Sequence, residues 1–283
     1  MSGKLINGKE IGNTIRQSIQ QEVNALKEQG ITPGLAVILV GDDPASHTYV
    51  SNKQKSCEQM GIYSELIKLS AEVTEETLLQ QIEQLNVNPA IDGILVQLPL
   101  PKHIDEQKVI ATISPEKDVD GFHPISVGKM LLGQPTFLPC TPYGVMKLLE
   151  HANVEIAGKH AVVVGRSHIV GVPMGQLLLQ KDATVTYCHS KTPDLKAITT
   201  QADILVVATG RAKMIGADHV KEGAVVIDVG MDRDENGKLC GDVDFNAVID
   251  KVSAITPVPG GVGPMTITML LSNTLQSAKK TLS

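Results

Sequence analysis

The chain has 283 residues, of which 42% are hydrophobic and 20% are charged, so it has the composition of an ordinary globular protein and the length of about two domains. Its net charge is −6, and it contains three Phe, four Tyr and no Trp. Because nucleic-acid binding needs basic grooves and aromatic stacking surfaces, this composition argues against a nucleic-acid partner. The segment MSGKLINGKE lacks the apolar core of a signal peptide, and no apolar run reaches the ~18 residues of a membrane span. We therefore expect a cytoplasmic protein with no membrane partner.

The cysteines indicate neither a disulfide framework nor a zinc site. Cys57, Cys140, Cys188 and Cys240 lie far apart and show no C-x-x-C spacing. Free thiols in a reducing compartment are the simplest interpretation, and we expect no metal.

The first half of the chain predicts a parallel α/β sheet. LAVILV (35–40) is a continuous apolar run typical of a buried strand, and Ser46 is a candidate cap for a helix that ends before Gly61. The order of the following elements is strand, helix and strand, in the segments 63–69, 74–85 and 91–97. This β-α-β-α-β order predicts right-handed crossovers.

The second half repeats the alternation and predicts a Rossmann-like domain. Thr141 and Pro142 open a helix, and four strands are expected at 160–165, 183–188, 203–210 and 224–230. The amphipathic segment 264–280 is expected to return to the first half as a closing helix. The fold class is therefore α/β with two domains, the first formed by residues 1–138 plus 262–283 and the second by residues 139–261.

Ligands of open parallel sheets bind at the carboxyl ends of the strands, and small or polar residues gather at these ends in this sequence. The segment VVVGRSHIVGVPMG (162–175) predicts a strand, a turn and a helix whose N-terminus receives a phosphate. A tight turn without a ligand has the same local pattern, but the surrounding α/β pattern favours a nucleotide. Ser167 replaces the second glycine of the G-x-G-x-x-G fingerprint and offers a hydroxyl instead.

The next strand end indicates which dinucleotide binds. An NAD site usually has a carboxylate there, whereas this strand ends in Cys188-His189-Ser190-Lys191. Arg166 and Ser190 suit a 2′-phosphate, so the expected cofactor is NADP.

Polar residues also gather at the strand ends of the first half. Tyr49 and Lys53 are four apart and share one helix face, and Gln97 follows a strand. Asp118 and Asp120 lie in the segment KDVDG. Each of these residues has an ordinary surface or turn explanation alone, but together they place an amine, an amide, a phenol and an acid at one sheet edge.

Seven segments resemble the bifunctional methylenetetrahydrofolate dehydrogenase/cyclohydrolase family, in the family's order and over nearly the whole chain. They are TYVSNK (48–53), VQLPLP (96–101), PEKDVDGFH (115–123), PCTPYG (139–144), VVGRSHIVGVP (163–173), DVGM (228–231) and PVPGGVGPMT (257–266).

The resemblance implies NADP-dependent oxidation of 5,10-methylenetetrahydrofolate, then hydrolysis of the methenyl product to 10-formyltetrahydrofolate. It implies that Lys53 is the catalytic lysine, Gln97 its partner, and Tyr49 and Asp120 folate-positioning residues. The other implied folate contacts are Pro259, Gly260 and Gly261. The implied NADP contacts are Gly165, Arg166, Ser167, Ser190 and Met231. A homodimer paired through the cofactor domain is also implied.

Two alternatives remain open from the sequence. A shikimate-dehydrogenase-like NADP enzyme has two α/β domains and an essential lysine, but gives VQLPLP and PGGVGP no role. A non-catalytic NADP-sensing module needs the glycine loop but not Tyr49, Lys53 and Gln97.

Overall fold

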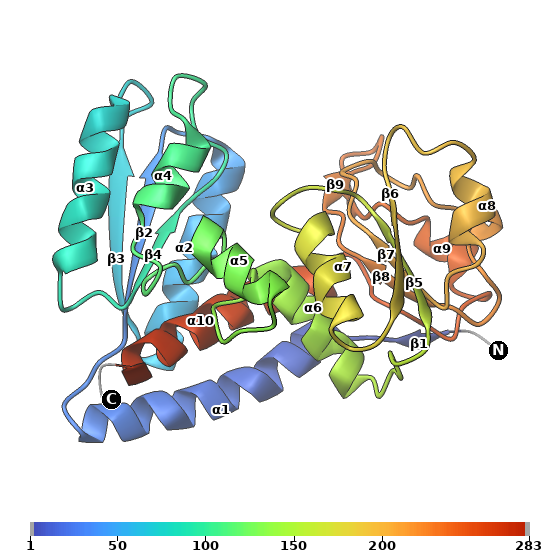
Figure 1. Ribbon diagram of the computed structural model, residues 1–283, viewed down its shortest axis with the longest axis horizontal. Coiled ribbons are helices and arrows are strands. Elements are labelled where there is room, and N and C mark those ends of the chain that lie inside the picture. The colour runs from blue at the N-terminus through green and yellow to red at the C-terminus, as the bar shows by residue number, and fades with distance from the viewer. Residues whose placement is uncertain (1–2, 281–283) are drawn as a thin grey trace. The chain divides into compact units, whose positions relative to one another are not determined.

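The computed structural model describes residues 3–280, without the side chain of Ala45. The chain divides into two compact units (Figure 1). Unit 1 contains residues 3–13 and 141–266, and unit 2 contains residues 14–140 and 267–280. Each unit is built on its own parallel sheet, which confirms the predicted α/β class.

Unit 2 is built on a three-stranded sheet with the strand order β3-β2-β4. Its strands are β2 (Gly34–Val40), β3 (Tyr63–Leu69) and β4 (Gly93–Val96). Its helices include α2 (Pro44–Met60), α3 (Glu75–Val87), α4 (Glu106–Thr112) and α5 (Pro124–Leu131). The crossovers β2–α2–β3 and β3–α3–β4 run in opposite directions across the sheet, so α2 and α3 cover opposite faces.

The core of unit 2 is aliphatic, as the scarcity of aromatic residues requires. Every residue of β2 is buried, which confirms the interpretation of its apolar run. Ala36, Ile38 and Val40 face the cluster that contains Leu78 and Ile82 of α3.

Two long helices complete unit 2. They are the C-terminal part of α10 (Val262–Lys280) and most of α1 (Gly8–Glu28). Lys279 of α10 forms an ion pair with Glu22 of α1. In α10, Asn273 donates to the carbonyl oxygens of Val119 (2.8 Å) and Leu138 (3.1 Å). The closing helix therefore returns to the first half of the chain, as predicted.

Unit 1 contains a six-stranded sheet with the order β1-β11-β8-β7-β5-β6, and all of its strand pairs are parallel. The strands are β5 (His160–Val164), β6 (Thr184–Cys188), β7 (Ile204–Val207), β8 (Val225–Asp228), β11 (Ala254–Ile255) and β1 (Lys4–Leu5). A short antiparallel pair is formed by β9 (Asp232–Arg233) and β10 (Leu239–Cys240). The helical segments are α6 (Cys140–His151), α7 (Gly171–Leu179), α8 (Leu195–Thr199), the 3₁₀ turn η1 (Ala217–His219) and α9 (Phe245–Val248).

The direction of the crossovers reverses at β5. The connection through α7 leads from β5 to β6 on one side, and the connection through α8 then leads to β7 on the other side of β5. Such a reversal is the place in an open α/β sheet where a ligand is expected, at the carboxyl ends of the strands.

The structure differs from the sequence predictions at two places near the N-terminus. Residues 3–13, predicted to belong to the first domain, lie in unit 1, because β1 pairs in parallel with β11 and extends the six-stranded sheet. The cap of α2 is Asp43 and not Ser46. The Asp43 carboxylate accepts the N–H of Ser46 at 2.8 Å, and Pro44 occupies the first turn.

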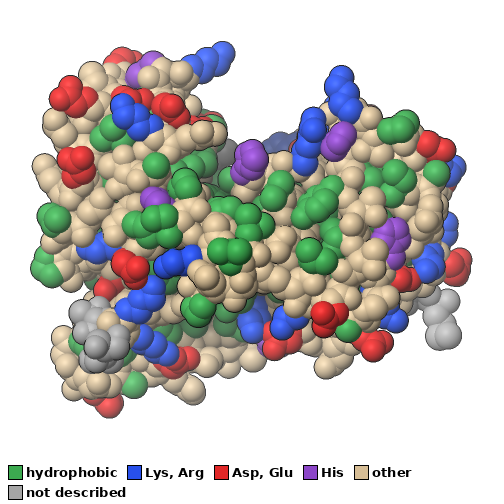
Figure 2. Space-filling view, viewed as in Figure 1, with side chains coloured by type: hydrophobic (Ala, Val, Ile, Leu, Met, Phe, Trp, Pro, Cys, Tyr) green, Lys and Arg blue, Asp and Glu red, His purple; other side chains and the backbone are tan. Residues whose placement is uncertain are grey.

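Surface charge and helix length bear on possible partners. On the face drawn in Figure 2, acidic and basic side chains are interspersed. Within residues 3–280, no helix is both long and apolar enough to cross a membrane.

Candidate functional site

At the carboxyl end of the unit 2 sheet, Lys53 and Gln97 are in direct contact. Lys53 lies in the middle of α2, and Gln97 directly follows β4. The Lys53 Nζ atom donates to Gln97 Oε1 at 3.0 Å. The sequence analysis placed these residues at one sheet edge, and the fold brings their polar atoms together.

The amide group of Gln97 has a fixed orientation. Its Nε2 atom donates to the carbonyl oxygen of Leu98 at 2.7 Å, so its Oε1 atom is the one that faces Lys53. Its backbone N–H donates to the carbonyl oxygen of Ile38 at 2.9 Å. Gln97 is therefore an acceptor that holds the amine of Lys53 in one direction.

Burial shifts the pKa values of Lys53 and Asp120 toward each other. Desolvation lowers the pKa of Lys53, although the nearby Asp120 carboxylate opposes the shift. Desolvation also raises the pKa of Asp120, with Lys53 and a hydrogen bond from Cys140 opposing the shift. Both changes favour the neutral form, and a neutral amine can accept a proton.

The loop that carries Asp120 is closed by a second aspartate, Asp118, which is 1% exposed. Its carboxylate accepts the backbone N–H of Phe122 (3.2 Å) and of His123 (2.9 Å). Burial raises the pKa of Asp118 to about 6, and these hydrogen bonds oppose the shift. Gly121 has φ +76°, and a Cβ there would lie 2.6 Å from the backbone of Leu138. The loop conformation is therefore set by Asp118 and by a required glycine.

Tyr49 lies one helical turn before Lys53 on α2, and its side chain is 38% exposed. Partial burial raises the pKa of its phenol, so it stays protonated at neutral pH. Exposed aromatic surface next to Lys53 gives a flat ligand ring a place to pack.

In unit 1, a cavity of about 420 Å³ opens at the carboxyl ends of β5, β6 and β7. It lies where the crossover direction reverses, as expected for a nucleotide site. Its lining residues are Val164, Gly165, Arg166, Ser167, His189, Ser190, Thr192, Leu195, Ala208, Thr209, Arg211 and Met214. Four of the five predicted cofactor residues, Gly165, Arg166, Ser167 and Ser190, are among them.

The glycine loop is formed by close approaches of the backbone. Gly165 has φ +137°, and a Cβ on it would lie 2.3 Å from the carbonyl oxygen of Ala208. A Cβ on Gly171 would lie 2.4 Å from the carbonyl oxygen of Gly165. Ser167 Oγ accepts the N–H of Val170 at 3.2 Å and of Gly171 at 3.3 Å, so this serine closes the turn before α7. Its hydroxyl can still donate its own proton to another acceptor, such as a ligand phosphate.

The charged and polar side chains of the cavity are available to a ligand. Arg166 and Ser190 are both exposed. The turn that carries Ser190 is held by Thr192, whose Oγ accepts the N–H of His189 at 2.8 Å. The structure places no carboxylate among the described residues that line this cavity.

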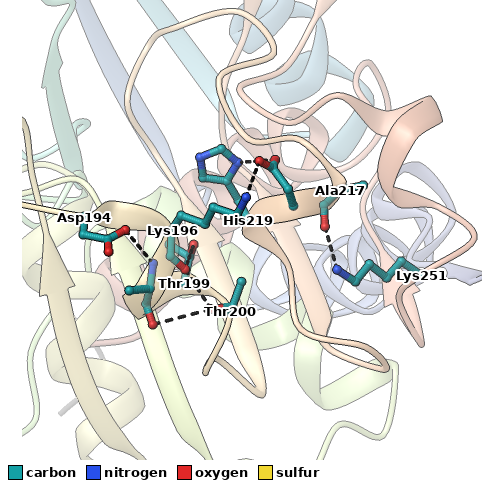
Figure 3. Close-up of polar contacts among 9 residues, drawn as sticks. Asp194, Lys196, Thr199, Thr200, Ala217, His219 and Lys251 are labelled. Atoms are coloured by element: carbon teal, nitrogen blue, oxygen red, sulfur yellow. Dashed lines mark hydrogen bonds and ion pairs between the residues drawn. The ribbon is translucent and has the colours of Figure 1, made fainter.

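Helix α8 contributes Leu195 to the cavity wall, and contacts outside the cavity hold the helix in place. Asp194 accepts the N–H of Ala197 at 3.2 Å and caps the helix. Lys196 reaches Asp218 at 2.8 Å, and Asp218 also contacts His219 at 2.8 Å in the neighbouring η1 turn (Figure 3). These contacts tie α8 to η1, and they lie outside the cavity.

The segment Pro259-Gly260-Gly261 forms a tight loop ahead of α10. Gly260 has φ +106°, and a Cβ on Gly261 would lie 2.6 Å from the carbonyl oxygen of Pro257. The Gly260 carbonyl accepts the N–H of Lys9 at 3.1 Å. Met231 is 46% exposed and lies outside the 420 Å³ cavity; its Cε atom is 3.1 Å from where a Cβ on Gly263 would be. Met231 is therefore next to this loop and not beside the other predicted cofactor residues.

The sequence analysis missed one group at the site of Lys53 and Asp120. Cys140 was interpreted only as a free thiol, although its motif PCTPYG was noticed. Its Sγ atom donates to the carbonyl oxygen of Val119 at 3.4 Å, and its pKa is raised well above the usual value, first by burial and then by Asp120. For Asp118, the ordinary explanation as a turn carboxylate agrees with the structure, because its carboxylate closes the loop that carries Asp120.

Comparison with known proteins identifies one family over both halves of the chain. The tetrahydrofolate dehydrogenase/cyclohydrolase catalytic-domain model matches residues 6–120, and the family's NAD(P)-binding-domain model matches residues 139–282. The bifunctional protein FolD of Lysinibacillus sphaericus is 71% identical over 283 residues, covering 100% of both chains.

Two solved structures match over the full fold. The bifunctional enzyme FolD of Campylobacter jejuni, a methylenetetrahydrofolate dehydrogenase/cyclohydrolase, has a TM-score of 0.98 and 51% identity, covering 99% of this chain and 100% of that chain. The dehydrogenase-cyclohydrolase of Trypanosoma brucei, solved with NADP cofactor and inhibitor, has a TM-score of 0.96 and 40% identity, covering 100% and 99%.

Proposed function

The chain belongs to the tetrahydrofolate dehydrogenase/cyclohydrolase family, and on that premise we propose how its residues carry out two consecutive reactions. It is a bifunctional enzyme. Its dehydrogenase activity oxidises 5,10-methylenetetrahydrofolate to 5,10-methenyltetrahydrofolate with NADP, and its cyclohydrolase activity hydrolyses that cation to 10-formyltetrahydrofolate. This function removes the two alternatives, a shikimate-dehydrogenase-like enzyme and a cofactor-sensing module.

Lys53 is the proposed catalytic residue of the hydrolysis. The observation that carries this assignment is the 3.0 Å contact from Lys53 Nζ to the oriented Gln97 amide oxygen. Because burial lowers the pKa of Lys53, its neutral amine is available to accept the proton that water loses on attacking the methenyl carbon. Gln97 fixes the orientation of the Lys53 amine. Hydride transfer itself releases no proton to a base, so Lys53 acts there mainly by alignment.

The folate contacts are assigned to residues of three motifs, TYVSNK (48–53), PEKDVDGFH (115–123) and PVPGGVGPMT (257–266). Asp120 is an anchor for the polar edge of the pterin, since a carboxylate accepts two hydrogen bonds from an amino-pyrimidine edge. Tyr49 packs against the folate ring. Pro259, Gly260 and Gly261 provide close-approaching backbone at the folate. The folate-binding catalytic domain is assigned to residues 14–140 and 267–280.

The residues of the unit 1 cavity fit NADP. Gly165 and Gly171 lack side chains that would collide with neighbouring backbone, so the tight turn that suits a phosphate can form, and Ser167 has a hydroxyl group beside them. Arg166 and Ser190 suit the 2′-phosphate, and the missing carboxylate removes the usual NAD contact. Met231, from the motif DVGM, is also assigned to the NADP site. NADP, when bound, supplies the hydride acceptor.

The expected assembly is a homodimer that works in the cytoplasm. Strand β6 is the edge of the six-stranded sheet, and Leu179 and Tyr187 beside it are 52% and 40% exposed. Such apolar surface next to an open edge suits a second copy of the chain. The four cysteines are free, which suits a reducing compartment. Sedimentation equilibrium of the purified protein tests the dimer.

One assay tests both activities. The protein is mixed with 5,10-methylenetetrahydrofolate and NADP, and formation and decay of the methenyl absorbance are followed with NADPH. We expect NADPH to accumulate while methenyltetrahydrofolate is formed and then hydrolysed faster than in buffer. NADPH formation without accelerated hydrolysis contradicts the role of Lys53, and no NADPH formation contradicts the cofactor assignment.

A further inference from the structure

Asp242 holds one wall of the cofactor cavity without lining it. This residue is fully buried, at 0% exposure, and follows β10. Its Oδ2 atom accepts the N–H of Thr209 at 2.6 Å and of Gly210 at 3.3 Å, and its Oδ1 atom accepts the N–H of Arg211 at 2.8 Å. One carboxylate therefore binds three consecutive amides.

The three amides belong to the loop that follows β7. Thr209 and Arg211 line the 420 Å³ cavity, whereas Asp242 does not. A loop after a strand has no ladder partner for its amides, so without the carboxylate these part-buried N–H groups would have to bind water or move. The place of the Thr209–Arg211 wall therefore depends on Asp242.

The Asp242 backbone is fixed in turn by Asp228, at the end of β8. The Asp228 carboxylate accepts the N–H of Asp242 at 3.0 Å and of Val243 at 3.0 Å. Gly241 fits between them only because it lacks a side chain: a Cβ there would lie 1.9 Å from Asp228 Oδ2. The contacts with Asp228 thus fix the backbone of Asp242, and with it the position of the Asp242 carboxylate.

A third aspartate, Asp232 of β9, meets the same carboxylate. A Cβ on Gly230 would lie 2.5 Å from the Asp242 carboxyl carbon, which brings the 230–232 segment against Asp242. Asp232 Oδ2 is buried and has no hydrogen-bond partner among the residues that the structure describes. Burial raises the pKa of Asp232, and its contact with Asp242 raises it further. Asp232 as a whole is partly exposed, and a carboxyl group beside the buried Asp242 carboxylate is stable when one of the two holds a proton.

We propose that Asp242 is a positioning residue for the cofactor, which holds the Thr209–Arg211 wall in place, with Asp232 as its proton-donating partner. The inference rests on the proposed function, because it takes the 420 Å³ cavity as the NADP site.

The first test removes the acceptor. Asp242→Asn keeps one carbonyl oxygen and turns an N–H group toward the three amides, so we expect the Kd for NADP, measured by titration calorimetry, to rise roughly tenfold or more. The KM for NADP rises while kcat at saturating NADP changes less. Hydrogen exchange of the amides at 209–211 becomes faster. The matched control is Asp203→Asn, at the opposite end of the sheet, where Asp203 accepts the N–H of His160 at 2.9 Å. This control loses stability but keeps the Kd.

The second test concerns the shared proton and does not depend on whether Asp242→Asn folds. Asp232→Asn supplies a permanent N–H to the Asp242 carboxylate, so its Kd for NADP stays within about twofold of wild type, below 0.5 kcal/mol by RT ln 2. Asp232→Leu supplies no donor and raises the Kd. Equal Kd values for these two variants would overturn the role of Asp232.

A third variant, Arg166→Ala, separates the two proposals. If Arg166→Ala weakens NADP binding and Asp242→Asn leaves the Kd unchanged, the positioning role of Asp242 is wrong and the cavity assignment stands. If neither variant changes the Kd, the cavity is not the NADP site and both proposals fail. An increase for both, with Asp203→Asn unchanged, supports them.

Discussion

The two groups of assigned residues lie at the carboxyl ends of two parallel sheets, but they are built in opposite ways. In unit 2, Lys53 and Asp120 are withdrawn from water, and desolvation shifts the pKa of each. In unit 1, Arg166 and Ser190 are exposed. The turn at the cavity is shaped by backbone segments so close together that only glycine fits between them.

This difference follows from what each end has to do. For a lysine to accept a proton near neutral pH its pKa must be lowered, and at Lys53 burial does this. Holding a phosphate needs N–H groups, full charge and room, so glycine and an exposed arginine are enough. The same strand-end position therefore serves chemistry in one unit and recognition in the other.

The sharpest test of this contrast is Lys53→Met, compared with Lys55→Met on the exposed face of the same helix. We expect Lys53→Met to lower cyclohydrolase kcat by ~10²–10⁴, the usual worth of general acid–base help, with NADP affinity unchanged. The dehydrogenase rate falls less, because hydride transfer needs no base. Lys55→Met retains both activities. A Lys53→Met protein that hydrolyses methenyltetrahydrofolate at the wild-type rate would falsify the mechanism.

Asp120→Asn gives the next largest effect. The amide keeps one acceptor oxygen and loses the charge, so kcat/KM for the folate should fall roughly a hundredfold, the upper range for a charged hydrogen bond. The Kd for NADP should not change. Asp105→Asn, which removes a carboxylate charge at the cap of α4 but keeps an acceptor oxygen, serves as the control for the amide substitution. A fall in NADP affinity for Asp120→Asn would move this residue to the other site.

The raised pKa of Asp118, in the loop that carries Asp120, can be tested by the pH dependence of the free energy of unfolding. Because burial raises the pKa of Asp118 to about 6, above the ~3.9 of an unfolded chain, the folded state keeps this proton longer than the unfolded state. The free energy of unfolding therefore decreases as pH rises from about 4 to about 6, by roughly 1–3 kcal/mol for this group. In Asp118→Asn this contribution is absent. Urea unfolding of both proteins at several pH values measures it, and a difference that is constant with pH contradicts the assignment.

The smallest effect is expected for Arg166→Ala, at the exposed cavity of unit 1. Its kcat/KM should fall roughly tenfold more with NADP than with NAD, because the variant loses one charge-assisted contact to the 2′-phosphate. Arg233→Ala is the matched control, since Arg233 donates to the carbonyl oxygen of Gly237 in the β9–β10 hairpin and lies outside the cavity. Equal losses with both cofactors would remove Arg166 from the 2′-phosphate site.

Most of the fold was predictable because its strands and helices have strong local signals. The run at 35–40 became a fully buried strand, and the helix predicted over 74–85 was found at Glu75–Val87 with Thr74 as its cap. Strand β1 was not predicted, because two exposed residues have no periodicity and depend on β11 for their conformation. The cap of α2 was misplaced because Asp43 and Ser46 are both good caps, and only the path of the chain decides between them.

The site was predictable in its residue types but not in its supporting contacts. The motif positions gave Lys53 and Gln97, and their 3.0 Å contact needed the fold. Asp118 accepts the N–H groups of Phe122 and His123 in its own loop, where the sequence showed only a turn carboxylate. Asp242 accepts N–H groups of a loop far earlier in the chain, and a sequence contains no local signal for such a contact. Met231 was grouped with the cofactor residues by its motif, while the structure places it outside their main cavity.

The pairing of β1 with β11 has a consequence for synthesis. Lys4 pairs with Ala254, so 254 − 4 = 250 residues separate the partners. At about 5–20 residues per second, the ribosome needs roughly 12–50 s to deliver β11 after β1 has been made. During that time strands β5, β6, β7 and β8 can already pair with one another, whereas β1 has no partner until β11 is made. The N-terminal strand is thus the first strand translated and the last to join its sheet, and a release of the nascent chain before residue 255 would leave the sheet edge at β8 open.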